Sequence, residues 1–354
     1  MEARSEVIER LAEKVGHTWP NVIAARERSG AMLARLRELL RGQDPEDTSI
    51  IVFGSFARGE YTVGSDIDWT LLIDGRADEA HLTQVRAITK LLKESKIQDE
   101  SPFGFFDNVT ISHPILHQIG GQDDTNRNTT QRILLLLESV AIGRPEAHER
   151  VLSLVLSRYI ADDRGLRFSK RKPPVLGFLF NDIVRYWRTI TIDFQNKQRN
   201  KRDGWALRNI KLRTSRKLLF ASGMLTCFSL QLFGNGEQWS SGEGERVDPA
   251  RILRFLRDRI RLTPLEHMAE ALLRPKISAE TVGMVMDNYD AFLGIVADDD
   301  KRKHLVNLPL EALGEDALFK EASRLTYTFQ DGLDRVFFEE DEEIASLVKR
   351  FGVF

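Results

Sequence analysis

The spacing of hydrophobic positions predicts helices at the start of the chain and then a short series of strands. Residues from about 4 to 42 follow a helical period. The short, β-branched and apolar run Thr48–Phe53 predicts a buried strand, and residues 66–74 and 103–112 predict two more. Between the second and third of these strands, residues 78–95 predict a helix with an acidic start.

Strand patterns fade after about residue 129, and most of the remaining chain has a helical period. The stretch TQRILLLLESVAI, residues 130–142, is predicted as helix. A glycine- and serine-rich loop, residues 234–248, separates two helical blocks. We therefore expect N-terminal helices in residues 1–45, an α/β core in residues 46–127 and a helical domain in residues 128–354.

The composition is that of an ordinary soluble globular protein, with 354 residues, of which 42% are hydrophobic and 29% charged. The formal net charge of −2 excludes global basicity, so a nucleic-acid or membrane partner would need a local patch. The single cysteine, Cys227, excludes an internal disulfide and fits a reducing compartment. Neither a signal-peptide pattern nor a long apolar run occurs in the sequence, so we expect a cytoplasmic protein without a membrane partner.

Two acidic residues interrupt the second predicted strand. Asp66 and Asp68 lie two positions apart, so in an extended chain both side chains point to the same side. The two carboxylates repel each other, and burying them is costly unless a positive partner compensates their charge. Mg²⁺ would supply that charge, because hard divalent cations prefer carboxylate oxygens, and Mn²⁺ would fit as well.

A glycine–serine turn precedes these aspartates. Gly54 and Ser55 directly follow the strand Thr48–Phe53, and a short helix is expected after them. Glycine lets the backbone approach a phosphate closely, and free N–H groups at a helix start can bind it. Ser55 and Arg58 are candidates to contact the outer phosphates of a nucleotide. Together with a pair of metal-binding aspartates, this turn is typical of phosphoryl-type transfer assisted by two metal ions.

The combined pattern, GSxxRG followed by SDID, resembles the nucleotidyltransferase superfamily related to DNA polymerase β, in the form of its minimal and uridylyltransferase-like bacterial branches. The matching positions are Gly54, Ser55, Arg58, Gly59, Ser65, Asp66 and Asp68. The resemblance covers roughly residues 30–125. It implies an α+β fold in which a small mixed sheet has helices on one side, followed in this chain by a mainly α-helical domain.

The resemblance also implies an activity and a set of site residues. The activity is the Mg²⁺-dependent transfer of a nucleoside monophosphate from an NTP or dNTP to an acceptor. Asp66 and Asp68 are then the catalytic metal ligands. The residues expected at the nucleotide are Gly54, Ser55, Arg58 and Ser65.

Members of this superfamily usually carry a third acidic residue on a later strand. Asp107 in FGFFDNVTIS is our candidate for this third catalytic, metal-binding carboxylate. Asp123 and Asp124, in a polar segment that opens a helix, are the alternatives. That helix is expected to be capped by Asn128 or Thr129.

A local excess of basic residues occurs in the helical half, although the whole chain is slightly acidic. Residues 185–220 contain eleven Lys or Arg and two Asp. Arg213 and Lys217 are our candidates for nucleotide binding, provided that this block faces the α/β core. A nucleic-acid backbone is the other anionic ligand that such a block favours.

The sequence leaves the acceptor open between a protein, a nucleotide and a nucleic-acid end, and a partner protein from the same operon is compatible with it. Two alternative functions also stay open. One is a catalytically inactive nucleotide-binding regulator. The other is a synthase of oligonucleotide signals, or an enzyme that modifies nucleic-acid ends, in bacterial defence.

Overall fold

The chain is divided into two compact units, each described here by itself. The computed structural model describes residues 2–62, 64–95, 97, 108–167, 175–199, 204–234, 239 and 247–352. The sheet unit comprises Arg26–Tyr186 and Gly236–Thr263. The helical unit comprises Met1–Ala25, Trp187–Asn235 and Pro264–Phe354. The predicted boundaries at residues 45 and 127 stay a prediction, because these units are groups of contacting residues and not functional domains.

The sheet unit is built around a four-stranded sheet in the order β3-β2-β1-β4. The strands are β1 (Thr48–Phe53), β2 (Trp69–Ile73), β3 (Val109–Ile111) and β4 (Ser139–Ala141). Strand β1 pairs antiparallel with both β2 and β4, whereas β2 pairs parallel with β3. The sheet is therefore mixed, as predicted.

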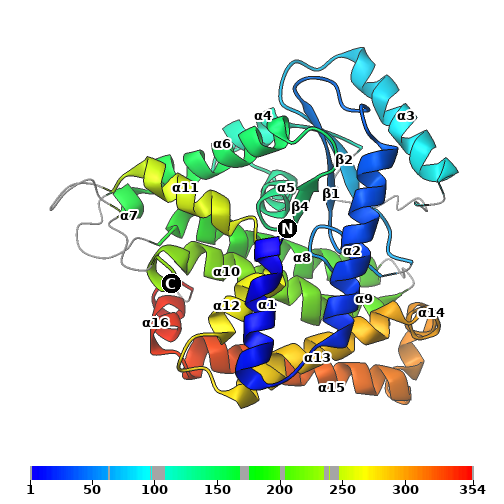
Figure 1. The fold of residues 1–354 in the computed structure, drawn as a ribbon, viewed down its shortest axis with the longest axis vertical. Coiled ribbons are helices and arrows are strands. Elements are labelled where there is room, and N and C mark those ends of the chain that lie inside the picture. Colours follow the sequence, from blue (N-terminus) through cyan, green and yellow to red (C-terminus); the bar gives the residue numbers. More distant parts are fainter. Residues whose placement is uncertain are drawn as a thin grey trace. The chain divides into compact units, whose positions relative to one another are not determined.

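The described helices of the sheet unit are α2 (Pro20–Leu39, from Arg26 onward), α3 (Glu79–Glu94), α4 (Ser112–His117), α5 (Asn126–Leu137), α6 (Glu146–Asp162), α7 (Arg164–Arg167), the first part of α8 (Gly177–Arg199) and α11 (Pro249–Arg259). Of these, α3, α5 and α6 contact strands of the sheet, whereas α7 and α11 pack on α6 (Figure 1). The side chain of Asp78 caps α3 by accepting a hydrogen bond from the backbone N–H of Ala80 at 2.8 Å. Aspartate is favoured at the N-cap because its carboxylate accepts hydrogen bonds from the free N–H groups of the first turn.

Alternation along β1 divides its side chains between two helical layers. Ile50 and Val52 belong to a buried cluster with residues of α2 and α3, such as Leu36 and Ile88. Ser49 has the opposite orientation, and its Oγ accepts a hydrogen bond from the backbone N–H of His148 in α6 at 3.1 Å. Helix α6 packs against β1 and β2, so the second face of the sheet is also covered, whereas the resemblance implied helices on one side.

The helical unit contains only helices in its described part. They are α1 (Glu2–Val15), the rest of α8, α9 (Trp205–Lys211), η1 (Leu212–Arg216), α10 (Lys217–Leu232), α12 (Pro264–Leu272), α13 (Ala279–Ala297), α14 (Asp299–Asn307), η2 (Leu310–Ala312), α15 (Ala317–Asp334), η3 (Arg335–Glu339) and α16 (Glu342–Phe351). Helices α13 and α15 lie side by side (Figure 1). Their contact includes the rings of Tyr289 and Phe329, whose centroids are 5.7 Å apart.

The structure confirms the predicted fold class, a small mixed sheet accompanied by a mostly helical remainder. The strand Thr48–Phe53 is also confirmed. The second strand is shorter than the predicted 66–74 and begins at Trp69. For the third strand, the structure describes Val109–Ile111, and residues 103–107 lie outside the described residues. None of the described helices combines the length and the apolar character that crossing a bilayer requires.

One element was predicted wrongly. Residues 130–142 were expected to be helical throughout, but α5 ends at Leu137 and β4 follows at Ser139–Ala141. The short strand gains its hydrogen-bond partners from β1, where Phe53 lies opposite Ser139. A partner that distant in sequence overrides the local helical pattern.

Candidate active site

The predicted glycine–serine turn connects β1 to the segment that leads into β2. Gly54 has a φ of +68°, in the left-handed region that glycine adopts readily. The chain then folds back on itself: the N–H of Arg58 donates to the carbonyl of Gly54 at 3.0 Å, and that of Glu60 to Ser55 at 2.8 Å. The short helix expected here is thus a series of hydrogen-bonded turns, Gly54–Gly59. Within the described part of the chain, the earlier N–H groups of the turn, on residues 55–57, have no acceptor.

Asp66 and Asp68 lie on the side of their segment that faces away from the core. Ile67 and Trp69, the neighbours in the alternation, are buried in the cluster that contains Val52. Asp66 is exposed and forms no hydrogen bond or ion pair with the residues that the structure describes. Asp68 is partly buried. This placement confirms the predicted alternation, with the apolar side chains inside and both carboxylates on the other side.

The end of β1 brings Asp68 next to the turn. The N–H of Phe53 donates to the backbone carbonyl of Asp68 at 2.9 Å, which extends the β1–β2 ladder by one residue. A Cβ atom placed on Gly54 would lie 3.2 Å from Oδ2 of Asp68. The carboxylate is therefore packed against the α-carbon of the glycine. Backbone N–H groups and a carboxylate adjoin one another here, an arrangement that suits a phosphate bridged by a cation.

Replacing Gly54 by alanine should therefore disturb the site more than the fold. The left-handed backbone costs an alanine about 1–2 kcal/mol, and the new methyl group also presses on the Asp68 carboxylate. We expect the nucleotidyl transfer that the resemblance implies to fall by about 10- to 100-fold, since small misplacements at a reacting centre have such effects.

Gly42→Ala is the matched control for this variant. Gly42 has a φ of +74°, and a Cβ atom there would meet nothing within 4 Å. Both variants should lose similar unfolding free energy in urea, whereas only Gly54→Ala should lose activity. Equal activities of the two variants would contradict the assigned contact.

Two other predicted nucleotide-binding residues are engaged within the sheet unit. Ser65 Oγ lies 3.0 Å from Oγ1 of Thr62, in the turn that precedes the aspartates. Arg58 is buried, and its Nε donates to Glu60 at 2.7 Å while its Nη1 donates to Glu138. Both side chains thus make contacts that hold the turns in place, so direct contact with a nucleotide would require these bonds to be exchanged.

Glu60 and Glu138 were not singled out in the sequence. Their side chains are only 4% and 2% exposed, so the ion pairs with Arg58 are shielded from water. Glu138 directly precedes β4, and Arg58 therefore ties the glycine–serine turn to the strand next to β1. The GxxxRGE spacing could have suggested Glu60, because an acidic residue lies two positions after the arginine. No local signal identifies Glu138, which is 80 positions away from Arg58.

The structure describes two of the three candidates for the third acidic residue. Asp107 lies outside the described residues. Asp123 is exposed in the loop before α5. Asp124 is buried, and its two oxygens accept from the guanidinium of Arg132 at 3.1 and 2.9 Å. Among the described residues there is no group of three or more acidic, histidine or cysteine side chains that could hold a metal ion.

The helix start in this loop is capped by a residue that differs from the expected one. Thr125 is the N-cap of α5, and its Oγ1 accepts from the N–H of Asn128 at 3.1 Å. The prediction of Asn128 or Thr129 as the cap was therefore wrong by three or four positions. The polar character of the segment misled the assignment, because several of its residues are equally good caps.

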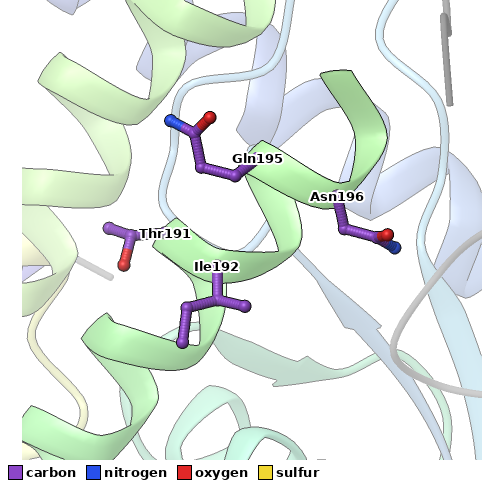
Figure 2. A pocket seen from close by; sticks show the side chains of 4 residues that line it. All are labelled: Thr191, Ile192, Gln195 and Asn196. Carbon is purple, nitrogen blue, oxygen red and sulfur yellow. The ribbon is translucent and has the colours of Figure 1, made fainter. Parts of the chain in front are cut away.

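A surface hollow of about 420 Å³ lies along α8, and none of the described residues predicted at the site lines it. It is lined by Thr191, Ile192, Gln195 and Asn196, which belong to the helical unit (Figure 2). Arg213 and Lys217 also belong to the helical unit, in η1 and at the start of α10. Their role in nucleotide binding stays a prediction.

Comparison with known proteins adds one finding to this geometry. Residues 33–103 match the family model described as a nucleotidyltransferase domain. The matched range contains β1, the glycine–serine turn, both aspartates, β2 and α3. No curated protein matches the chain. The match and the small mixed sheet together support a domain of the polymerase β-type nucleotidyltransferase superfamily in this part of the chain.

Proposed function

We propose that the protein transfers a nucleoside monophosphate from an NTP or dNTP to an acceptor and releases pyrophosphate. The observation that carries this proposal is the packing of the Asp68 carboxylate against Gly54, within the range that matches a nucleotidyltransferase domain. A phosphate-binding turn and a cation-binding carboxylate must adjoin one another for this reaction, because the same phosphates are held by both.

Each part of the site then has a defined task. The N–H groups of residues 55–57 and the Ser55 hydroxyl hold the outer phosphates of the nucleotide, and Gly54 lets the backbone approach them. Asp66 and Asp68 hold Mg²⁺, or Mn²⁺ in its place. Two carboxylates together with substrate phosphates are a sufficient ligand set for Mg²⁺. When bound, the ion supplies positive charge at the reacting phosphates.

Arg58 and Ser65 act in this proposal by positioning the turns that carry the site. Arg58 connects the glycine–serine turn to Glu138 beside β4, and Ser65 closes the turn before the aspartates. Asp107 remains our proposed third carboxylate. The proposal for the specific branch is the one that the sequence motif favours, the minimal and uridylyltransferase-like bacterial branch.

The test is incubation of the purified protein with each α-labelled NTP and dNTP in the presence of Mg²⁺. Parallel reactions contain cell lysate as a source of acceptors, and others contain EDTA. We expect label in a product that depends on the metal and is lost when Asp66 and Asp68 are both replaced by alanine. Label in a ladder or small molecule without lysate would identify a nucleotide acceptor, and label on a lysate protein or RNA would identify a macromolecular one. The absence of label with every nucleotide would overturn the proposal.

A further inference from the structure

An exposed aromatic ring and two cations meet in the helical unit where η1 packs against α15. The guanidinium carbon of Arg213 lies 4.1 Å from the centroid of the Tyr327 ring, in a cation–π contact. Tyr327 is 56% exposed despite this contact. Lys217 lies four positions after Arg213, and its Nζ donates to the amide oxygen of Gln330 in α15. Two helices from distant parts of the sequence thus place these side chains together.

The cations in this cluster are poorly compensated. In the part of the chain that the structure describes, neither Arg213 nor Lys217 forms an ion pair with a carboxylate. Burial lowers the pKa of Lys217 below its ordinary value, and the nearby charge of Arg213 lowers it further, against an opposing effect of Asp334. An anionic ligand would therefore relieve an unfavourable concentration of positive charge.

A third cation extends the cluster along α15. Arg324 is exposed and lies one helical turn before Tyr327, on the same side of the helix. Its side chain likewise has no ion-pair partner among the described residues. The helix surface is no longer basic after Tyr327. Gln330 donates a hydrogen bond to Asp334 at 2.6 Å, and this carboxylate marks the C-terminal limit of the basic stretch on α15.

The local backbone is also unusual. η1 is a π-helical turn, Leu212–Arg216, inserted between the α-helices α9 and α10. Such turns occur frequently at functional sites. Thr214 and Ser215 are buried, and their hydroxyl groups donate to carbonyls one turn earlier in the same segment, at 2.7 and 3.3 Å. The inserted turn therefore places its polar hydroxyls inward and leaves Arg213 partly buried beside the tyrosine.

We propose that Arg213, Lys217, Arg324 and Tyr327, here called the Arg213 cluster, bind single-stranded nucleic acid. The cations contact backbone phosphates, and an unstacked base lies against the exposed part of the tyrosine ring. A free phosphate or an acidic peptide would gain little from the exposed aromatic ring. A duplex keeps its bases stacked inside the helix and cannot use the ring either. The combination of several cations with an aromatic platform is the arrangement by which single strands are held without sequence preference.

This inference goes beyond the proposed function, because it assigns a ligand to the helical unit and does not depend on catalysis. Binding is measured without NTP and without a divalent metal. A failure of the labelled-transfer experiment would therefore leave it standing, and its own failure would leave the transferase proposal standing.

The experiment is fluorescence anisotropy of the full-length protein with labelled single-stranded RNA and DNA of about 20 nucleotides, longer than one such site occupies. Unlabelled duplex of the same length serves as competitor, and salt is varied between about 50 and 200 mM. The variants are Arg213→Gln, Arg324→Gln, Tyr327→Ala and Tyr327→Phe. Arg350→Gln is the matched control, because Arg350 lies over the ring of Phe351 at 5.3 Å on α16 and its loss removes the same charge and the same type of contact.

We expect Tyr327→Ala to weaken binding about fivefold or more, the smallest effect typical of a lost stacking partner, and Tyr327→Phe to bind like the wild type. Each arginine variant should weaken binding and make its salt dependence shallower by about one unit of the logarithmic slope. Arg350→Gln should change neither. Stronger binding of RNA or of DNA would identify which strand is preferred, and either supports the proposal. Absence of binding, variants that bind like the Arg350→Gln control, or equally tight binding of duplex would overturn it.

Discussion

Asp66→Asn and Asp68→Asn are each expected to reduce nucleotidyl transfer by about 10²- to 10³-fold, the size typical of removing one electrostatic stabiliser of a transition state. The physical reason is that asparagine keeps the size and one oxygen of the carboxylate but loses the charge that binds Mg²⁺. The measurement is the rate of metal-dependent label transfer from an α-labelled NTP at saturating Mg²⁺.

The fold should tolerate both substitutions. Asp66 is exposed, and its side chain has no hydrogen-bonding or ionic partner among the described residues. Asp68 contributes to the β1–β2 ladder through its backbone carbonyl, which asparagine retains. Asp258→Asn on α11 is the control, because it removes one carboxylate from the same unit at a side chain that is 73% exposed. Wild-type transfer rates in both site variants would refute the assignment of the metal ligands.

The same assay separates the candidates for the third carboxylate. Asp107→Asn should lose transfer to a similar extent. Asp123→Asn should have little effect, because this side chain is exposed in a loop. Asp124→Asn should lower stability instead, because its carboxylate is a buried partner of Arg132.

The parts of the site that could be predicted are those whose partners are close in sequence. The apolar strand, the glycine turn and the alternating aspartates all lie between Thr48 and Ile73, and each follows from a local rule. Period-2 alternation places Asp66 and Asp68 on one side. Position 54 requires glycine for two reasons, the positive φ and the proximity of Asp68. The sequence indicates a turn, and so predicts the first reason, but it does not indicate the second.

What escaped prediction depends on partners far along the chain. Arg58 was expected to contact phosphate, but it meets Glu138, which no pattern near the motif indicates. Strand β4 forms because its three residues pair with the edge of β1. The stretch QRILLLL predicts only an amphipathic or buried helix, and nothing in it shows that Arg132 is completely buried. Arginine is rarely buried completely unless it is paired, and the pairing partners of Arg132 cannot be identified from the sequence.

Arg132 is nonetheless the centre of a buried polar network in the sheet unit. Its Nη2 lies 2.7 Å from Asp182 and 2.9 Å from Asp124, and its Nε donates to the hydroxyl of Tyr159 at 2.8 Å. The Tyr159 hydroxyl in turn donates to Asp182. Burial by itself lowers the pKa of Arg132, but its contacts with Tyr159 and the two carboxylates outweigh this effect and raise the pKa above its ordinary value. The network thereby joins α5, α6, α8 and the loop before α5 through a single charged group.

Arg132→Met is accordingly expected to lower the free energy of unfolding by about 3–5 kcal/mol, because two buried carboxylates lose a shared partner. Asp124 keeps its ion pair with Arg185 at 3.3 Å in this variant. The cost of an uncompensated buried charge therefore falls mainly on the Asp182 carboxylate. Arg150→Met is the matched control: Arg150 also pairs with two carboxylates, but its side chain is 43% exposed. Its loss should cost at most about 1 kcal/mol.

The measurement is urea unfolding at neutral pH, followed by a probe of the sheet unit. Combining Arg132→Met with Asp182→Asn should recover part of the loss, since the second change removes the uncompensated charge. Arg132→Lys should fall between the wild type and Arg132→Met, because it keeps the charge but not the fork that reaches three partners at once. Equal losses of unfolding free energy in Arg132→Met and Arg150→Met would contradict this prediction. The buried guanidinium would then contribute no more to stability than the exposed one.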